Sequence, residues 1–309
     1  MGIKNYIAIA RPSHWFKNAF VLPGTFIAAL FTDTPITEFG WRLLIGLSSV
    51  CFVASANYVI NEWLDAKFDR YHPVKKNRPS AVGDVKASLV YTEYVVLSVA
   101  GLAAAAFVSK YFLAATVAFL IMGILYNAEP FRTKDKVYLD VLSESFNNPI
   151  RLILGWFIVT DRFYLPSSLI LGYWMGGAFL MAVKRYAELQ SIPDLQAAKL
   201  YRRSFQYYTR QNLLVSAFFY GQCSAFFLGV FLIKYRIELL LSLPLFALLF
   251  AMYLHIGLRP NSIAQNPELL YREKFLVIYL ALLIIVISLL LFLDLPWLTW
   301  FLQNSFISG

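Results

Sequence analysis

The sequence predicts an all-α integral membrane protein with about nine transmembrane helices. Hydrophobic residues make up 59% of the 309 positions and charged residues only 15%, which departs from the balance of a soluble domain. The mean hydropathy is +0.61. Apolar stretches of about 20 residues, the length that a helix needs to cross the hydrocarbon core, recur along the whole chain. Lipid is therefore the expected solvent for much of this protein.

Nine apolar stretches are separated by short polar loops, and the first of them is the shortest. They lie at residues 17–31, 41–63, 88–109, 111–128, 139–160, 167–187, 212–234, 239–257 and 275–295. No Gly-rich, Ser-rich or low-complexity linker divides them, so we expect a single transmembrane domain over residues 1–309.

The basic residues are distributed unevenly between the two sides of the predicted membrane. Most of the 27 Lys and Arg residues fall at the N-terminus, in the even-numbered loops or at the adjoining helix ends. The positive-inside rule therefore places the N-terminus in the cytoplasm. Because the basic residues are confined to short loops, the net charge of +9 does not indicate nucleic-acid binding.

The strongest chemical signal is an acidic pattern at the end of the second predicted span. Glu62, Asp65 and Asp69 follow at i, i+3 and i+7, so on a continuing helix their carboxylates share one face, with Asn61 beside them. Carboxylates stacked this closely repel one another unless a cation neutralises them. Hard oxygen ligands suit Mg²⁺ that bridges to a substrate diphosphate. The predicted metal ligands are Asn61, Glu62, Asp65 and Asp69.

The loop that follows is basic and stiffened by two prolines. Lys75, Lys76 and Arg78 stand there, and such a loop can hold phosphate oxygens opposite a metal ion. Two other interpretations stay open: the acids pair with Lys67 and Arg70 at a solvated helix end, or the loop cations set the membrane orientation and contact lipid headgroups.

A second polar stripe enters the fifth predicted span. Asp140, Glu144, Asn147 and Arg151 are spaced by 4, 3 and 4 residues and are expected to share one helical face. Ionisable residues at membrane depth are costly and usually face a cavity or one another. The alternative is a buried ion pair that ties helices together.

Further candidates stand at the end of the sixth span and where the first span begins. Lys184, Arg185 and Glu188 close the sixth span, while Lys17 and Asn18 begin the first. A structural Lys184–Glu188 pair and an interfacial anchor at the first span are the alternatives to a role in substrate binding.

Three stretches together resemble the UbiA superfamily of membrane transferases, and within it the decaprenyl-phosphate phosphoribosyltransferase branch. They read RPSHWFKN (residues 11–18), NEWLDAKFDRYHPVKKNRP (61–79) and KRYAEL (184–189). The resemblance implies a UbiA-type helical bundle with its active site on the cytoplasmic face, in a multi-pass protein of the bacterial inner (plasma) membrane. Homo-oligomerisation is compatible with this architecture.

The resemblance also implies an activity, a cofactor and two substrates. The activity is Mg²⁺-dependent transfer of 5-phosphoribose from phosphoribosyl diphosphate to a polyprenyl phosphate, with release of diphosphate. The motifs and the polar stripe together give the candidate catalytic residues Asp65, Asp69, Lys17, Arg78 and Lys184. The candidate substrate-binding residues are Asn18, Asn61, Lys75, Lys134, Asp140, Asn147, Arg151, Arg185 and Glu188.

Two alternative functions remain. Ordinary UbiA prenyltransferases transfer a prenyl group from an allylic diphosphate to an aromatic or other lipophilic acceptor, and they carry a second acidic motif after the sixth helix. This chain has Lys184, Arg185 and Glu188 there, and cations at this position favour phosphate binding and hence phosphoribosyl transfer. An ion or proton transporter that uses the intramembrane stripe is the second alternative.

Overall fold

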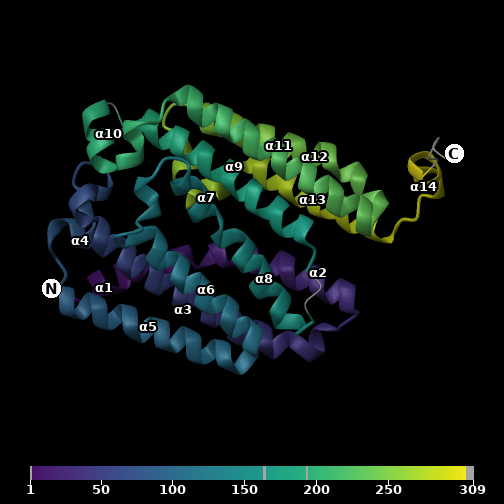
Figure 1. Cartoon of the computed structure of the whole chain (residues 1–309), viewed down its shortest axis with the longest axis horizontal. Helices are drawn as coiled ribbons and strands as arrows, with labels where there is room; N and C mark the ends of the chain where they lie inside the picture. The colour runs from purple at the N-terminus through teal and green to yellow at the C-terminus, as the bar shows by residue number, and fades with distance from the viewer. Residues whose placement is uncertain (1, 163–164, 193, 304–309) are drawn as a thin grey trace. The chain divides into compact units, whose positions relative to one another are not determined.

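The computed structural model describes residues 2–162, 165–192 and 194–303, and it contains helices and no strand within these ranges. The chain divides into two compact units (Figure 1). Unit 1 comprises Met1–Leu165 and Ile192–Asn212, and unit 2 comprises Pro166–Ser191 and Leu213–Gly309. The single domain expected over residues 1–309 stays a prediction.

Unit 1 is built around the long helix α3 (Ile36–Asp69), which packs against α1, α5, α6 and α8. Buried side chains such as Val53, Phe112 and Trp156 fill the core between these helices. The other elements of unit 1 are α1 (Ile3–Ala10), η1 (Pro12–Val21), α2 (Leu22–Thr32), η2 (Lys75–Asn77), α4 (Pro79–Val82), α5 (Ala87–Val108), α6 (Lys110–Asn127), η3 (Thr133–Asp135), α7 (Leu139–Ser145), α8 (Asn147–Val159), α10 (Leu195–Tyr201) and η4 (Arg203–Gln206).

Unit 2 is a smaller group of helices in which α12 (Leu243–Leu258) packs against α9 and α13. The rings of Phe179 on α9 and Phe250 on α12 stack with their centroids 4.6 Å apart. The other elements are α9 (Ser167–Ser191), most of α11 (Arg210–Tyr235), η5 (Ile237–Ser242), η6 (Ile263–Gln265), η7 (Pro267–Arg272), α13 (Lys274–Phe292) and α14 (Pro296–Gln303).

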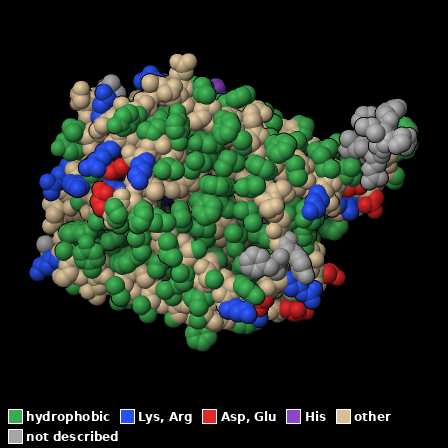
Figure 2. Space-filling view, viewed as in Figure 1, with side chains coloured by type: hydrophobic (Ala, Val, Ile, Leu, Met, Phe, Trp, Pro, Cys, Tyr) green, Lys and Arg blue, Asp and Glu red, His purple; other side chains and the backbone are tan. Residues whose placement is uncertain are grey.

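The helices have the length and surface of membrane-spanning segments. Six are long and apolar enough to cross a bilayer among the residues that the structure describes: α3, α5, α6, α11, the continuous η5–α12 segment and α13. Hydrophobic side chains cover most of the visible face in Figure 2, and charged side chains gather in small groups near its margins. Lipid can solvate such a surface, whereas water cannot without a large cost. The protein is therefore a multi-pass membrane protein.

Each of the nine predicted spans falls on helical structure, but three include more than one element. Residues 17–31 are shared between η1 and α2, and residues 239–257 between η5 and α12. Residues 139–160 form α7 and α8 with an interruption at Phe146. Pro149, the third residue of α8, has no N–H to donate to the carbonyl of Ser145, and its ring crowds that carbonyl. A single helix over 139–160 is therefore not formed.

Glycines allow the backbones of α2 and α8 to touch. A Cβ atom on Gly155 would lie 2.0 Å from the carbonyl oxygen of Val21, and one on Gly24 would lie 1.9 Å from that of Leu152. The hydroxyl of Thr25 donates a hydrogen bond to the Gly155 carbonyl at 3.2 Å. Close approach through small residues is a common way to pack helices in lipid.

We expect Gly155→Ala to destabilise the protein by about 1 to 3 kcal/mol, because the added methyl overpacks the α2–α8 contact. Thermal unfolding of the detergent-solubilised protein measures the effect. Gly40→Ala is the control, since no atom lies within 4 Å of a Cβ at that helical position and alanine favours helix. Equal unfolding temperatures for the two variants would contradict the close contact.

Candidate active site

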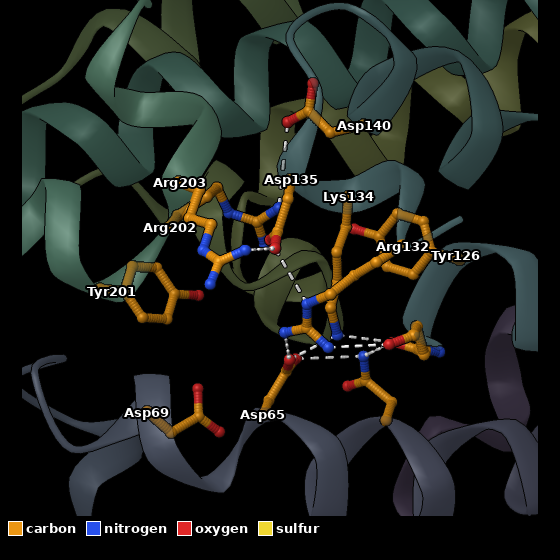
Figure 3. Close-up of polar contacts among 12 residues, drawn as sticks. Asp65, Asp69, Tyr126, Arg132, Lys134, Asp135, Asp140, Tyr201, Arg202 and Arg203 are labelled. Atoms are coloured by element: carbon orange, nitrogen blue, oxygen red, sulfur yellow. Dashed lines mark hydrogen bonds and ion pairs between the residues drawn. The ribbon is translucent and has the colours of Figure 1, made fainter. Parts of the chain in front are cut away.

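A pocket in unit 1 brings together three segments that are distant in the sequence. The segments are the end of α3, the loop between α6 and α7 that contains η3, and the junction of α10 and η4 (Figure 3). The side chains that line the pocket are Asp65, Phe68, Asp69, Arg132, Lys134, Asp135, Tyr201 and Arg202. Since α3 continues without a break past the predicted span, Asp65 and Asp69 lie one turn apart on one helical face, as predicted.

Asp65 is surrounded by hydrogen-bond donors. Its Oδ1 accepts Nη2 of Arg132 at 2.8 Å and also pairs with the ammonium of Lys134. Its Oδ2 accepts the side-chain amide of Asn61 at 3.2 Å. Cations of the α6–α7 loop therefore neutralise this carboxylate, rather than the nearby residues Lys67 and Arg70 of the alternative interpretation.

Asn127, the last residue of α6, organises the loop that carries these cations. Its Oδ1 accepts hydrogen bonds from Asn61 at 2.5 Å and from Lys134 at 2.6 Å, and its carbonyl oxygen accepts Nη1 of Arg132 at 2.7 Å. Burial lowers the pKa of Lys134 to about 8, against the opposing effect of the Asp65 carboxylate. The basic side chains are thus held in fixed positions before any ligand binds.

Asp69 has a partner of its own from the loop after α3. Its Oδ2 accepts Nη1 of Arg78 at 2.7 Å, and Asp69 points into the pocket (Figure 3). Arg78 precedes Pro79, which favours the extended backbone observed there. Burial acts to lower the pKa of the Arg78 guanidinium, but the carboxylates of Asp69 and Glu62 outweigh it and raise that pKa.

Glu62 pairs with Arg11, at the start of η1. Nη2 of Arg11 donates to Oε2 of Glu62 at 2.6 Å, and the Glu62 side chain is only 3% exposed. Glu62 is not among the side chains that line the pocket of Asp65 and Asp69. Its role as a metal ligand stays a prediction.

The two pocket carboxylates fit a metal that arrives together with a phosphate ligand. No group of three or more His, Cys, Asp or Glu side chains able to hold a metal ion occurs within the described part of the chain. Mg²⁺ usually binds through one or two carboxylates and completes its shell with water and substrate phosphates. Asp65 and Asp69, one helical turn apart, provide such a donor set.

The wall formed by α10 and η4 closes the pocket opposite the acids. Nζ of Lys75 donates to the hydroxyl of Tyr201, and the Tyr201 ring meets the edge of His72 with centroids 4.7 Å apart. Arg202 follows directly and also lines the pocket. Lys75, predicted from the loop after α3, is thus linked to the pocket through Tyr201.

Asp140 lies behind this wall, on the side away from Asp65 and Asp69 (Figure 3). It is fully buried, and its two oxygens accept the hydroxyl of Tyr208 at 2.7 Å and that of Ser204 at 3.2 Å. Nη1 of Arg202 lies 3.9 Å from Oδ2 of Asp140. These contacts connect α7 to the α10–η4 segment, and a direct contact of Asp140 with substrate stays a prediction.

Other predicted residues form a second polar cluster between η1 and α8. Nε of Arg151 donates to Oδ1 of Asn18 at 3.2 Å, and its Nη1 donates to the carbonyl of Asn147 at 3.4 Å. Nζ of Lys17 lies 3.3 Å from Nδ1 of His14 on η1. None of these residues is among those lining the pocket, and their roles in catalysis or binding stay predictions.

Lys184, Arg185 and Glu188 lie on α9 in unit 2. Nη1 of Arg185 pairs with Oε2 of Glu188 at 3.2 Å, and both side chains are almost completely buried. Since α9 and the pocket belong to different units, the participation of these three residues in one site stays a prediction.

Comparison with known proteins decides the family. The model of the UbiA prenyltransferase family matches residues 21–267. The chain belongs to the UbiA prenyltransferase family. It is 32% identical over 216 residues to the decaprenyl-phosphate phosphoribosyltransferase of Mycobacterium tuberculosis, covering 68% of each chain. It is 24% identical over 227 residues to the nodulation protein NoeC of Azorhizobium caulinodans, covering 73% of this chain and 71% of that protein.

Solved structures show the same fold. A UbiA homologue from Archaeoglobus fulgidus bound to GPP and Mg²⁺ superposes with a TM-score of 0.66 at 21% identity, covering 92% of this chain and 99% of the homologue. Another structure of an Archaeoglobus fulgidus UbiA homologue holds Cd²⁺ and has a TM-score of 0.64 at 19% identity, again covering 92% and 99%. The predicted UbiA membrane fold is therefore confirmed.

Five residues that line the pocket of this UbiA protein were not predicted as site residues from the sequence: Phe68, Arg132, Asp135, Tyr201 and Arg202. Among the charged and polar ones, Arg132, Tyr201 and Arg202 follow no recognisable spacing from the acidic pattern. Arg202 stands in the charge-dense loop after the sixth span, and Arg132 stands in the basic cluster before the fifth. This local enrichment in charge is the signal by which they could have been found.

We expect Arg11→Ala to destabilise the protein by about 3 to 5 kcal/mol, because it leaves the buried carboxylate of Glu62 without its cation. Thermal unfolding in detergent checks this. Combining Arg11→Ala with Glu62→Gln removes the uncompensated charge and should recover part of the loss. No recovery in the double variant would show that the Arg11–Glu62 pair does not explain the effect.

Proposed function

We propose that this UbiA family member transfers a 5-phosphoribosyl group from 5-phosphoribosyl 1-diphosphate to a polyprenyl phosphate and releases diphosphate, with Mg²⁺ as cofactor. The observation that carries the proposal is the pocket in which Asp65 and Asp69 face Arg132, Lys134 and Arg202. The relative of 32% identity from Mycobacterium tuberculosis, named for transfer of this kind, supports the same reaction.

The pocket combines the two features that a diphosphate donor requires. Two carboxylates supply hard oxygens for a divalent cation. Around them, guanidinium and ammonium groups supply donors for phosphate oxygens, and the planar fork of an arginine matches phosphate geometry. In the structure Arg132 and Lys134 pair with the carboxylate of Asp65. A bound metal ion would replace them as the partner of the carboxylates, and the cations would then bind the phosphate oxygens.

In this reaction the bond from the anomeric carbon to the departing diphosphate oxygen breaks, and a bond from the same carbon to an oxygen of the lipid phosphate forms. Mg²⁺, when bound to Asp65 and Asp69, would neutralise charge on the departing diphosphate. Lys134 and Arg78 would stabilise the same charge by hydrogen bonding. An ionised lipid phosphate oxygen is already a nucleophile, so no general base is required.

Alignment is then the main contribution of the protein. In the transition state the bond to the departing diphosphate is partly broken and the bond to the lipid phosphate is only partly formed, so the anomeric carbon carries positive charge. Dipoles and charges that are already fixed around the sugar would stabilise this charge, because the protein need not reorganise. The polyprenyl tail of the acceptor would stay in lipid beside the exposed apolar helices. The membrane is thus part of the substrate-binding surface.

Prenyl transfer from an allylic diphosphate is the second candidate. A structural relative was solved with GPP and Mg²⁺, and the same carboxylate pair would serve an allylic diphosphate. The two reactions differ in the donor. Phosphoribosyl diphosphate carries a phosphomonoester in addition to its diphosphate, whereas an allylic diphosphate carries the diphosphate alone. Family membership supports a transferase and leaves the transporter interpretation without support.

The first test incubates the purified protein with Mg²⁺, phosphoribosyl diphosphate and a polyprenyl phosphate. We expect release of diphosphate and a phosphoribosylated lipid detectable by mass spectrometry, both dependent on the metal and on the lipid. Product formation from geranyl diphosphate and an aromatic acceptor, with none from phosphoribosyl diphosphate, would instead establish prenyl transfer.

Asp65→Asn and Asp69→Asn should each lower kcat by about 100-fold or more, because each removes a charge that holds the metal and its diphosphate. Each variant leaves a cation without its carboxylate and should be less stable than wild type, so folding in detergent is checked alongside activity. Asp33→Asn is the control: Asp33 lies outside the pocket at the end of α2 in a left-handed conformation that asparagine tolerates. Full activity of the Asp65 variant would refute the proposed site.

We also propose that the pocket faces the cytoplasm, because the loops that form it belong to the even-numbered loops, which together with the N-terminus and the adjoining helix ends carry most of the basic residues. A cysteine replacing Tyr207, which is 69% exposed, should react with a membrane-impermeant maleimide in inverted vesicles but not in intact spheroplasts. A cysteine replacing Asp161 should show the opposite pattern. Both tests use a chain with Cys51→Ala and Cys223→Ala, and labelling of position 207 from outside would reverse the assignment.

A further inference from the structure

We propose that Arg202, together with Tyr201, forms a subsite for a second phosphate group of the donor, the phosphomonoester of a sugar phosphate, and that Asp140 positions this subsite. The inference rests on the proposed function, because a phosphoribosyl donor carries a phosphomonoester in addition to its diphosphate.

The two walls of the pocket differ in chemistry. The wall from α3 presents Asp65 and Asp69, which suit a metal and its diphosphate. The wall from α10 and η4 presents Tyr201 and Arg202, which offer a phenol and a guanidinium (Figure 3). A ligand with a diphosphate at one end and a phosphomonoester at the other matches this division.

Arg202 lies beside a buried carboxylate. Asp140 is fully buried, lies 3.9 Å from Nη1 of Arg202, and accepts the hydroxyls of Ser204 and Tyr208. The hydroxyl of Tyr208 in turn accepts the backbone N–H of Tyr138 at 2.7 Å. Asp140 therefore fixes the segment from Arg202 to Tyr208 against the start of α7.

Tyr201 is fixed from the other side. Its ring packs against His72, and its hydroxyl accepts the ammonium of Lys75. A phenolic hydroxyl can accept one hydrogen bond and donate another, so its chemistry suits a phosphate oxygen as a partner. The pair of Tyr201 and Arg202 is thus preorganised by contacts to both flanking segments.

Burial distinguishes Arg202 from its neighbour. The Arg202 side chain is 13% exposed, whereas that of Arg203 is 52% exposed. Arg203 lies 3.4 Å from Asp135, whose side chain is 15% exposed, and 4.0 Å from the exposed Glu129. Because half of the Arg203 side chain is in solvent, these pairs carry little energetic weight. A guanidinium carries five N–H donors, so Arg202 can form a bidentate contact with a phosphate while it remains beside Asp140.

The subsite would also select the donor. An allylic diphosphate has a single anionic group and an apolar remainder, and it gains nothing from a buried guanidinium on the second wall. A sugar donor with a phosphomonoester gains charge-assisted hydrogen bonds there. Arg202 is in this way a specificity-determining residue, and Asp140 is a positioning residue that acts through it.

The test compares Arg202→Gln with Arg203→Gln by isothermal titration calorimetry on the purified full chain. The three probes are ribose 5-phosphate, phosphoribosyl diphosphate with Mg²⁺, and inorganic diphosphate with Mg²⁺. Arg202→Gln should weaken the binding of ribose 5-phosphate and of phosphoribosyl diphosphate about 10- to 100-fold, because a charge-assisted hydrogen bond is lost. Inorganic diphosphate should bind within about two-fold of wild type, and Arg203→Gln should leave all three unchanged.

Three results would overturn the subsite. They are an equal loss of affinity for all three probes, no loss for any of them, and no binding of ribose 5-phosphate to the wild-type protein. If Arg202→Gln does not fold, Arg202→Lys replaces it. Arg202→Lys keeps the positive charge but lacks the planar guanidinium. It should lose less affinity than Arg202→Gln, for the same two probes. If wild type binds ribose 5-phosphate in the expected pattern but makes no phosphoribosylated lipid, the proposed function fails and the subsite stands.

The role of Asp140 is tested through Tyr208→Phe, which removes one hydroxyl donor without touching the pocket. It should raise the KM for phosphoribosyl diphosphate several-fold while kcat changes little, because the subsite is loosened and the metal site is intact. A purely structural role would instead lower the unfolding temperature and the yield without altering KM. That result would remove Asp140 from the proposal.

Discussion

The ion pairs of Asp65 with Arg132 and Lys134 hold the candidate active site in its observed arrangement. They join the end of α3 to the α6–α7 loop, and Asn61 and Asn127 complete the network with short hydrogen bonds. Removing charges from water is expensive, so a group of this kind is stable only when each member has its partners. The loop therefore has little freedom to sit elsewhere.

The same electrostatic constraint bears on the proposed function. The cations that pair with the acids would turn to the phosphates of a diphosphate donor, so that binding would exchange partners rather than assemble a new site. The α10–η4 wall is fixed independently, through Asp140 and through the Lys75–Tyr201 contact. A rigid helix end and two tethered segments thus position the functional groups.

Packing in the membrane supports this arrangement. The long helix α3 contacts most other helices of unit 1, and the backbones of α2 and α8 meet through Gly24 and Gly155. In lipid the hydrophobic effect does not drive helices together, so close contact and buried polar pairs such as Arg11–Glu62 must do so. Buried polar groups near the candidate site thus contribute to holding the bundle.

The sequence by itself determined the features that depend on local regularity. Apolar length located the spans, and helical periodicity placed Asp65 and Asp69 on one face, because both follow from the rise and turn of a helix. Only the tertiary structure decided which cations meet these acids. Arg132 lies 67 residues from Asp65, and Tyr201 lies 126 residues from Lys75. Such pairings depend on how loops return to the bundle, and no local periodicity encodes them. The pairing of Glu62 with Arg11 was decided in the same way, by an electrostatic contact between segments that are brought together only by folding.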